Sequence, residues 1–174
     1  MHIRFAAPEL EVLDGLACEA LAVPLFSDER PLAGVLGLVD WRMCGFVSRM
    51  LLEGRIAGEP NEHVLLPGRP KLAMEKLFVF GLGPERSFGP ALVVGCVSRM
   101  LRTLQAARVR SAALVLPGRH TDRIDAATAV EALIAAIAAA ELHDDIVVIE
   151  PLEAQRAMEP VIERERRRTR AGTE

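Results

Sequence analysis

Residues 77–116, LFVFGLGPERSFGPALVVGCVSRMLRTLQAARVRSAALVL, decide the fold of this chain. The apolar runs Leu77–Phe80 and Ala112–Leu116 are short and continuous, which is typical of strands covered on both faces. Between them, from Gly89 onward, apolar residues recur every three or four positions and predict a long amphipathic helix. Its apolar face consists of Val93, Val97, Met100, Leu101 and Leu104. A strand, a helix and a second strand in this order are the repeating unit of an α/β protein.

The same alternation of strands and helices continues on both sides of this stretch. We expect further strands at His2–Phe5, Ala20–Phe26, His63–Leu66 and Ile146–Ile149. Pro24 favours an edge position or a strand end for the second of these, because proline cannot donate to a sheet ladder. The runs His63–Leu66 and Leu77–Phe80 have the pattern of central strands. The sequence therefore predicts an α/β sandwich built on a mixed, mostly parallel sheet.

Three more helices are expected. Apolar residues at helical spacing predict one continuous helix that Gly54 ends, and its buried face would be Val39, Met43, Phe46, Val47, Met50 and Leu51. Asp122 is the expected cap of a second helix, lined by Val130, Leu133, Ile134 and Ile137. A third, from Leu152 to about Arg170, should be kinked or interrupted at Pro160.

Length and composition limit the class of protein. With 174 residues, 18.9 kDa and 51% apolar residues, we expect one domain over 1–174, with a core at about 17–150. Residues 151–174 should form a helical, charged and partly frayed end. A net charge of −3 and only seven aromatic residues argue against nucleic acid as a partner. No apolar run is long enough to span a membrane, so we expect a cytoplasmic protein. The cysteines at 18, 44 and 96 are expected to be buried thiols.

One internal repeat stands out. Val47–Leu51 (VSRML) recurs as Val97–Leu101, and Leu66–Arg69 (LPGR) recurs as Leu116–Arg119, both fifty residues later. Two interpretations are open. The chain could hold two equivalent α/β units that present matched Gly–Arg turns at the same sheet edge. Alternatively, the matches could arise because amphipathic helices and strand-ending Pro–Gly turns are built from a small set of residue types.

The strongest signal for a ligand is the glycine pair of Gly81–Leu82–Gly83, which follows a buried strand and precedes the helix beginning near Pro90. Glycines there would let the backbone approach an anion near free helix N–H groups. The spacing fits neither a dinucleotide-binding fingerprint nor a P-loop, so a purely structural turn is the alternative. Arginines beside such a site could add charge-assisted hydrogen bonds. The candidate ligand-binding residues are Gly68, Arg69, Gly81, Gly83, Gly118 and Arg119.

Signals for catalysis are sparse. His120 and Asp122 could act as a base and its orienting carboxylate, but no serine or cysteine stands in a nucleophile elbow. We therefore expect His120 to be a surface histidine in a loop. Asp144 and Asp145 are expected to end a helix rather than to form an acid/base pair. The histidines lack the spacing of a zinc-binding helix, and we predict no metal and no cofactor.

Three segments carry a resemblance to a known family: His63–Gly68 (HVLLPG), Leu77–Gly83 (LFVFGLG) and Arg110–Gly118 (RSAALVLPG). Their order and spacing resemble the N-terminal domain of the leucyl (cytosol) aminopeptidases, over roughly Ala17 to Ile149. The resemblance implies a three-layer, macro-domain-like α/β/α fold. In that family a separate C-terminal domain holds two metal ions, and its motif Asn-Thr-Asp-Ala-Glu-Gly-Arg is missing here, since Asn61 is the only asparagine. No catalytic residue can be carried over, and we expect no enzyme activity.

The resemblance leaves three functional hypotheses. A non-catalytic relative would assemble with itself or with a full-length aminopeptidase, since the family's N-terminal domains pack around a hexameric catalytic core. Alternatively, the macro-like sheet edge would bind a nucleotide or an ADP-ribose-like ligand through its glycines, which is an argument by analogy of fold. The third hypothesis is a small hydrolase that uses His120 and Asp122.

Overall fold

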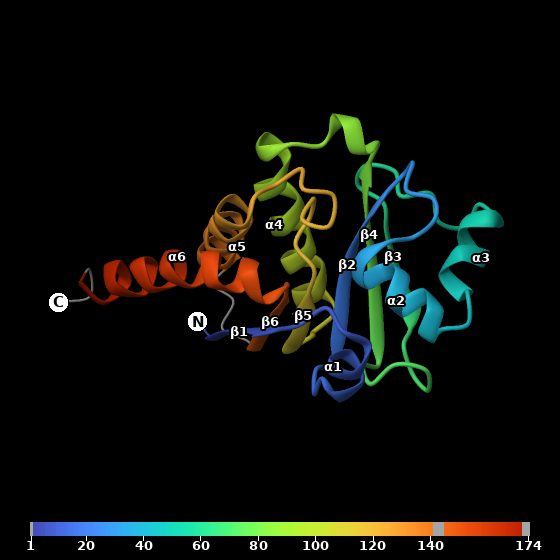
Figure 1. Cartoon of the computed structure of the whole chain (residues 1–174), viewed down its shortest axis with the longest axis horizontal. Coiled ribbons are helices and arrows are strands. Elements are labelled where there is room, and N and C mark those ends of the chain that lie inside the picture. The colour runs from blue at the N-terminus through green and yellow to red at the C-terminus, as the bar shows by residue number, and fades with distance from the viewer. Residues whose placement is uncertain (1, 141–144, 172–174) are drawn as a thin grey trace.

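The computed structural model of the chain describes residues 2–140 and 145–171 (Figure 1). Its strands are β1 (His2–Ala6), β2 (Ala20–Phe26), β3 (His63–Pro67), β4 (Lys76–Gly83), β5 (Ser111–Leu114) and β6 (Asp145–Ile149). They form one sheet in the order β1-β6-β5-β2-β4-β3, in which only β3 runs antiparallel to its neighbour. The predicted mixed, mostly parallel sheet is confirmed.

Helices cover both faces of the sheet and complete three layers (Figure 1). They are α1 (Leu10–Gly15), α2 (Gly34–Arg42), α3 (Phe46–Leu52), α4 (Pro90–Ala106), α5 (Ala126–Ala140) and α6 (Leu152–Ala171). Side chains of α4, α5 and α6 share one hydrophobic core with one face of the sheet, and those of α1, α2 and α3 share a second core with the other. Alternate residues of β2 point into the two cores, as strand geometry requires.

The stretch that decides the fold has the predicted structure. Helix α4 begins at Pro90, where the missing N–H is not needed, and all five residues of its predicted apolar face are buried. Strands β4 and β5 flank β2 in the middle of the sheet. Helix α5 buries Val130, Leu133 and Ile137 as expected.

Two strands were predicted in the wrong place. Strand β2 is central although it contains Pro24. Its ladder to β5 ends at Ala22, so the missing N–H of Pro24 is not needed on that side, while the ladder to β4 continues to Phe26. Strand β3 is the antiparallel edge strand, and its residues are largely exposed on one face. An apolar run of four residues does not by itself distinguish a central strand from an edge strand that packs on one side.

The predicted single helix across residues 39–51 is wrong. The chain breaks into α2 and α3 because Cys44 and Gly45 have positive φ values of 58° and 74°. Val39 of α2 and Val47 of α3 are buried in the same core, which explains why the spacing looked continuous. The break also exposes Cys44, in contrast to the expected buried thiol, whereas Cys18 is buried and Cys96 is half-buried.

Two helix ends also differ from the prediction. Asp125, not Asp122, caps α5, since its carboxylate accepts the Thr128 N–H at 2.9 Å. Asp122 instead lies in the preceding turn with a φ of 55°. Helix α6 is not interrupted at Pro160, which lies on an exposed side where water can satisfy the carbonyl that proline leaves free.

The fifty-residue repeat does not place matched turns at one edge. Strand β3 is antiparallel, so Gly68 and Arg69 follow its end beside the start of β4. Gly118 and Arg119 follow β5 at the carboxyl edge of the parallel strands. The two Gly–Arg turns therefore lie beyond opposite ends of the strands. This arrangement excludes the interpretation that two equivalent units face one site.

Candidate functional site

The topology directs attention to the carboxyl ends of β2 and β5. These strands are neighbours, but β2 leads to α2 on one face of the sheet and β5 leads to α5 on the other. Ligands of open α/β sheets bind in the crevice that such a reversal creates. Here the loops of residues 27–33 and 115–125 follow the two strands at this point of the sheet.

Glu29 in the loop after β2 and His120 in the loop after β5 contact each other at these strand ends. The Nε2 atom of His120 lies 3.1 Å from Oε2 of Glu29, and the side chains are only 13% and 9% exposed. The Glu29 carboxylate also accepts the N–H of Ala33 at 3.1 Å and that of Phe26 at 3.3 Å. His120 Nε2 is not aligned for a hydrogen bond, so its contact with Glu29 is electrostatic.

The surroundings favour a charged Glu29. Burial by itself raises the pKa of Glu29, but His120 and the two backbone N–H groups outweigh it and lower the pKa below its ordinary value. A carboxylate of this kind is ionised at neutral pH.

His120 is therefore not the surface loop residue that the sequence predicted. Its ring packs beside Phe26, with centroids 5.7 Å apart, and a Cβ on Gly34 would come within 3.1 Å of its own Cβ. Glu29, rather than the expected Asp122, is its carboxylate partner. Asp122 is exposed. The proposed pair of a base and its orienting group is not formed by these two residues.

Arg119 already has internal partners. Its guanidinium donates to both carboxylate oxygens of Glu150, at 3.0 and 3.2 Å, and to the Ile124 carbonyl at 2.7 Å. The two charged side chains are 14% and 3% exposed. Burial raises the pKa of Glu150, although the neighbouring Arg119 opposes that shift. Arg119 thus holds the loop after β5 against the end of β6.

Three predicted glycines lie at this edge, where each allows close packing of the chain on itself. A Cβ on Gly81 would lie 2.1 Å from the Glu59 carbonyl oxygen, and one on Gly83 would lie 2.7 Å from the Pro60 ring. Gly118 has a φ of 76° and leaves no room for a Cβ beside Ile124. The glycine pair therefore admits the loop of residues 57–62.

Gly68 and Arg69 lie at the opposite edge of the sheet. A Cβ on Gly68 would meet the Met74 carbonyl oxygen at 2.3 Å. Arg69 is exposed and lies 3.6 Å from Glu75. The structure brings together Gly81, Gly83, Gly118 and Arg119 at one edge, but not these two residues.

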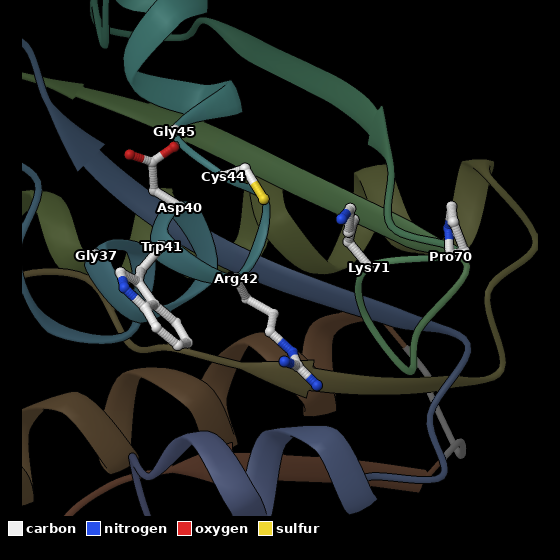
Figure 2. A pocket seen from close by; sticks show the side chains of 8 residues that line it. All are labelled: Gly37, Asp40, Trp41, Arg42, Cys44, Gly45, Pro70 and Lys71. Carbon is white, nitrogen blue, oxygen red and sulfur yellow. The ribbon is translucent and has the colours of Figure 1, made fainter.

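A second feature lies on the face formed by α2 and α3. A cavity of ≈810 Å³ separates the corner between these helices from the loop that joins β3 to β4 (Figure 2). Trp41 at the end of α2 lines it and is 68% exposed, and Leu52 at the end of α3 is 90% exposed. Lys71 faces this corner from the opposite loop.

The charged groups around this cavity are not equivalent. The Asp40 carboxylate already has hydrogen-bond partners within the chain, since its Oδ1 accepts the N–H groups of Val47 at 2.7 Å and Ser48 at 3.0 Å. Arg42 pairs with Asp14 at 2.8 Å. Within residues 2–140 and 145–171, the Lys71 ammonium group has no hydrogen-bonding or ionic partner, whereas the Lys71 backbone N–H donates to the Gly68 carbonyl at 3.1 Å. The cavity therefore presents an indole ring and one free cation.

Sequence reasoning did not single out Glu29, Glu150 or Trp41. Glu29 and Glu150 find their partners about 90 and 31 residues away along the chain, which no local pattern signals. The exposure of Trp41 depends on the break after α2. A pair of αL residues at Cys44–Gly45 is the only local hint, since glycine favours that conformation.

The structure also locates several of the remaining residues that the sequence singled out. Asp144 and its neighbour His143 lie outside the described residues, while Asp145 pairs with Arg4. Among the described residues, no three His, Cys, Asp or Glu side chains gather as metal ligands. In the same part of the chain, no helix has both the length and the hydropathy to span a membrane.

Solved structures with this arrangement define the class of protein. The Trypanosoma brucei macrodomain in complex with ADP-ribose has a TM-score of 0.73 and 15% identity, covering 92% of this chain and 69% of its own. A mutant of tomato leucine aminopeptidase has a TM-score of 0.62 and 14% identity, covering 91% of this chain and 35% of its own. The chain is thus a macrodomain-like α/β/α protein.

Sequence comparison identifies the family. The model of the cytosol aminopeptidase family, N-terminal domain, matches residues 22–146, and the chain belongs to this family. A probable cytosol aminopeptidase of Thermosynechococcus vestitus is 27% identical over 135 aligned residues, and the match covers 74% of this chain and 25% of that protein. The chain spans about a quarter or less of the length of the curated relatives it matches.

Proposed function

We propose that this chain is a non-catalytic member of its family that acts by assembly, either with itself or with a full-length aminopeptidase. The match to the N-terminal domain of the family supports this proposal. Such a chain acts in the cytoplasm, in keeping with the name of its cytosol aminopeptidase relatives.

The observation that carries the proposal is the exposed Trp41 beside the cavity on the α2–α3 face. Tryptophan is enriched among the residues that dominate binding energy at protein interfaces. Burying roughly 100 Å² of its surface would contribute about 2.5 kcal/mol at ~25 cal/mol per Å². The cavity could accept an apolar side chain of a partner, and Lys71 could pair with an acidic one.

Light scattering tests the proposal directly. The chain is measured alone and mixed with a full-length aminopeptidase of this family from the same organism. We expect a mass above 18.9 kDa for the chain alone, or co-elution with the enzyme in the mixture. A monomer that also elutes separately from the enzyme would contradict the proposal.

A second candidate function is binding of a nucleotide or an ADP-ribose-like ligand at the carboxyl edge of the sheet. The macrodomain in complex with ADP-ribose supports it through likeness of fold. Calorimetric titration of the chain with ADP-ribose tests this candidate, and flat heats at high protein concentration would remove it.

A further inference from the structure

Strand β3 forms one edge of the sheet and has β4 as its neighbour on one side only (Figure 1). Beyond the start of β3, the Gly81 N–H donates to the Glu62 carbonyl at 2.8 Å. Beyond its end, the Gly68 N–H donates to the Glu75 carbonyl at 2.8 Å. Hydrogen-bonded residues alternate along an antiparallel ladder, so the even-numbered residues of β3 bond to β4.

The odd-numbered residues His63, Leu65 and Pro67 therefore direct their backbone groups away from the sheet. His63 and Leu65 offer an N–H and a carbonyl each, whereas Pro67 offers only a carbonyl. None of these groups has a hydrogen-bond partner within residues 2–140 and 145–171. The Leu65 side chain is also 53% exposed. Natural edge strands are protected by charges, bulges or prolines, and β3 has only Pro67. This edge is therefore open to another strand.

Charges of opposite sign lie beyond the two ends of β3. Glu59 precedes the strand and Lys71 follows it, and both residues are exposed. Among the described residues, neither the Glu59 carboxylate nor the Lys71 ammonium group has a partner. If two β3 strands pair antiparallel with Leu65 opposite itself, His63 lies opposite Pro67. Glu59, six residues before Leu65, then lies near Lys71 of the other copy, six residues after it. The edge is thus complementary to itself in charge and in backbone donors and acceptors.

We infer that two copies of this chain pair through their β3 edges, about a two-fold axis at Leu65, to form one continuous sheet. The Leu65 N–H of each copy donates to the Leu65 carbonyl of the other, and each His63 N–H donates to a Pro67 carbonyl. Such a contact closes on itself and gives a dimer rather than a fibre. The inference rests on self-assembly in the proposed function and names its partner. Because Lys71 also lines the cavity beside Trp41, the paired strands adjoin the α2–α3 face.

Sedimentation equilibrium of the chain alone measures the dimer, and Leu65→Pro is the variant that blocks the edge. The substitution removes an N–H that points away from β4, so it removes no bond within the chain. We expect dimerisation of Leu65→Pro to be at least about tenfold weaker than that of the wild type. Leu65→Val keeps the N–H and is the matched control, expected to dimerise within about threefold of the wild type. A dimer of Leu65→Pro as tight as that of the wild type would overturn the pairing.

Charge reversal tests the register without relying on a substitution inside the strand. Glu59→Lys and Lys71→Glu each replace an attraction between the copies by a repulsion, and each should weaken the dimer about tenfold at low salt. The double variant restores opposite charges across the two-fold axis, and it should dimerise within about threefold of the wild type. Both residues are exposed, so all three chains are expected to fold. A double variant as weak as the single variants would overturn the inferred register.

Failure of this inference is distinguishable from failure of the proposed function. A wild-type dimer that is insensitive to Leu65→Pro and to both charge reversals overturns the pairing of β3 edges and leaves assembly standing. A wild-type chain that is monomeric on its own also overturns the pairing. Co-elution with the full-length aminopeptidase then decides the proposed function separately.

Discussion

Two buried carboxylates, Glu29 and Glu150, lie at the carboxyl edge of the sheet, each against a basic side chain of the loop after β5. His120 and Arg119, adjacent in sequence, are their partners. Because buried charges are costly without such partners, these contacts fix the loop in one conformation. The candidate ligand residues of this loop therefore have internal roles that a ligand would have to compete with.

Removing one member of the Arg119–Glu150 pair should be costly. Arg119→Met leaves the Glu150 carboxylate buried and uncompensated, and we expect a loss of about 3 kcal/mol in the free energy of unfolding. The double variant with Glu150→Met should lose less than the sum of the single variants, as measured by urea denaturation. The exposed pair Arg123–Glu85 is the control, and Arg123→Ala should change stability by about 0.5 kcal/mol or less. An unaltered stability of Arg119→Met would show that the guanidinium is free for other partners.

The lowered pKa of Glu29 makes its contribution to the free energy of unfolding depend on pH. A carboxyl group whose pKa is lower in the folded state stabilises the fold above its ordinary pKa, and this contribution disappears as the pH falls through the folded value. The difference in unfolding free energy between the wild type and Glu29→Gln should therefore be largest above about pH 5 and shrink toward about pH 3. The exposed Glu59→Gln is the control. A difference that grows on acidification would contradict the assigned contacts.

Substitution of Gly81, with Gly95 as the control, tests whether Gly81 is needed for close packing of the chain. A Cβ at Gly81 would collide with the Glu59 carbonyl, whereas Gly95 lies within α4 with nothing within 4 Å. We expect Gly81→Ala to lose about 2 kcal/mol and Gly95→Ala to gain about 0.5 to 1 kcal/mol. Thermal unfolding of both variants measures this. Equal tolerance at the two positions would mean that Gly81 is not packed as described.

At the scale of elements, the corner between α2 and α3 is the least predictable part of the fold. Helix α3 begins without a capping side chain of its own flanking residue, and Asp40 from α2 supplies the acceptor for Val47 and Ser48. The cap, the break and the exposure of Trp41 thus arise together. They create the surface on which the assembly proposal rests.

Asp40→Ala should loosen this corner. We expect a loss of about 1 to 2 kcal/mol, with faster hydrogen exchange of the α3 amides. Asp125→Ala, which removes the cap of α5, should cost a similar amount while leaving exchange in α3 unchanged. Unchanged exchange in α3 of the Asp40 variant would contradict the role of this cap.

The elements that sequence predicted well are those fixed by periodicity. Helix α4 shows all five predicted buried residues, and β4 and β6 are buried as expected. Predictions failed where nonlocal context decides, as in the central position of the strand with Pro24 and the edge position of β3. At the candidate site, the glycines and Arg119 were found from turn chemistry. Glu29 and Glu150, the partners of His120 and Arg119, were not predicted, because only the folded sheet brings them near.

At the scale of the whole molecule, the fold of the chain is similar to that of a macrodomain and to part of a leucine aminopeptidase. The two proposals use different parts of it. The carboxyl edge of the sheet carries internal ion pairs, whereas the α2–α3 face carries an exposed aromatic residue and an open cavity. Assembly is therefore expected to involve the second surface.

Sedimentation velocity of the wild type and two single variants, alone and with the full-length aminopeptidase, tests this claim most directly. Trp41→Glu alters the α2–α3 face, and Leu152→Glu alters an exposed leucine at the start of α6 as the matched control. We predict a larger species for the wild type and for Leu152→Glu, and at least a tenfold weaker association for Trp41→Glu, in keeping with the loss of an interfacial tryptophan. Association that is the same for all three chains, or absent from all of them, would contradict the account.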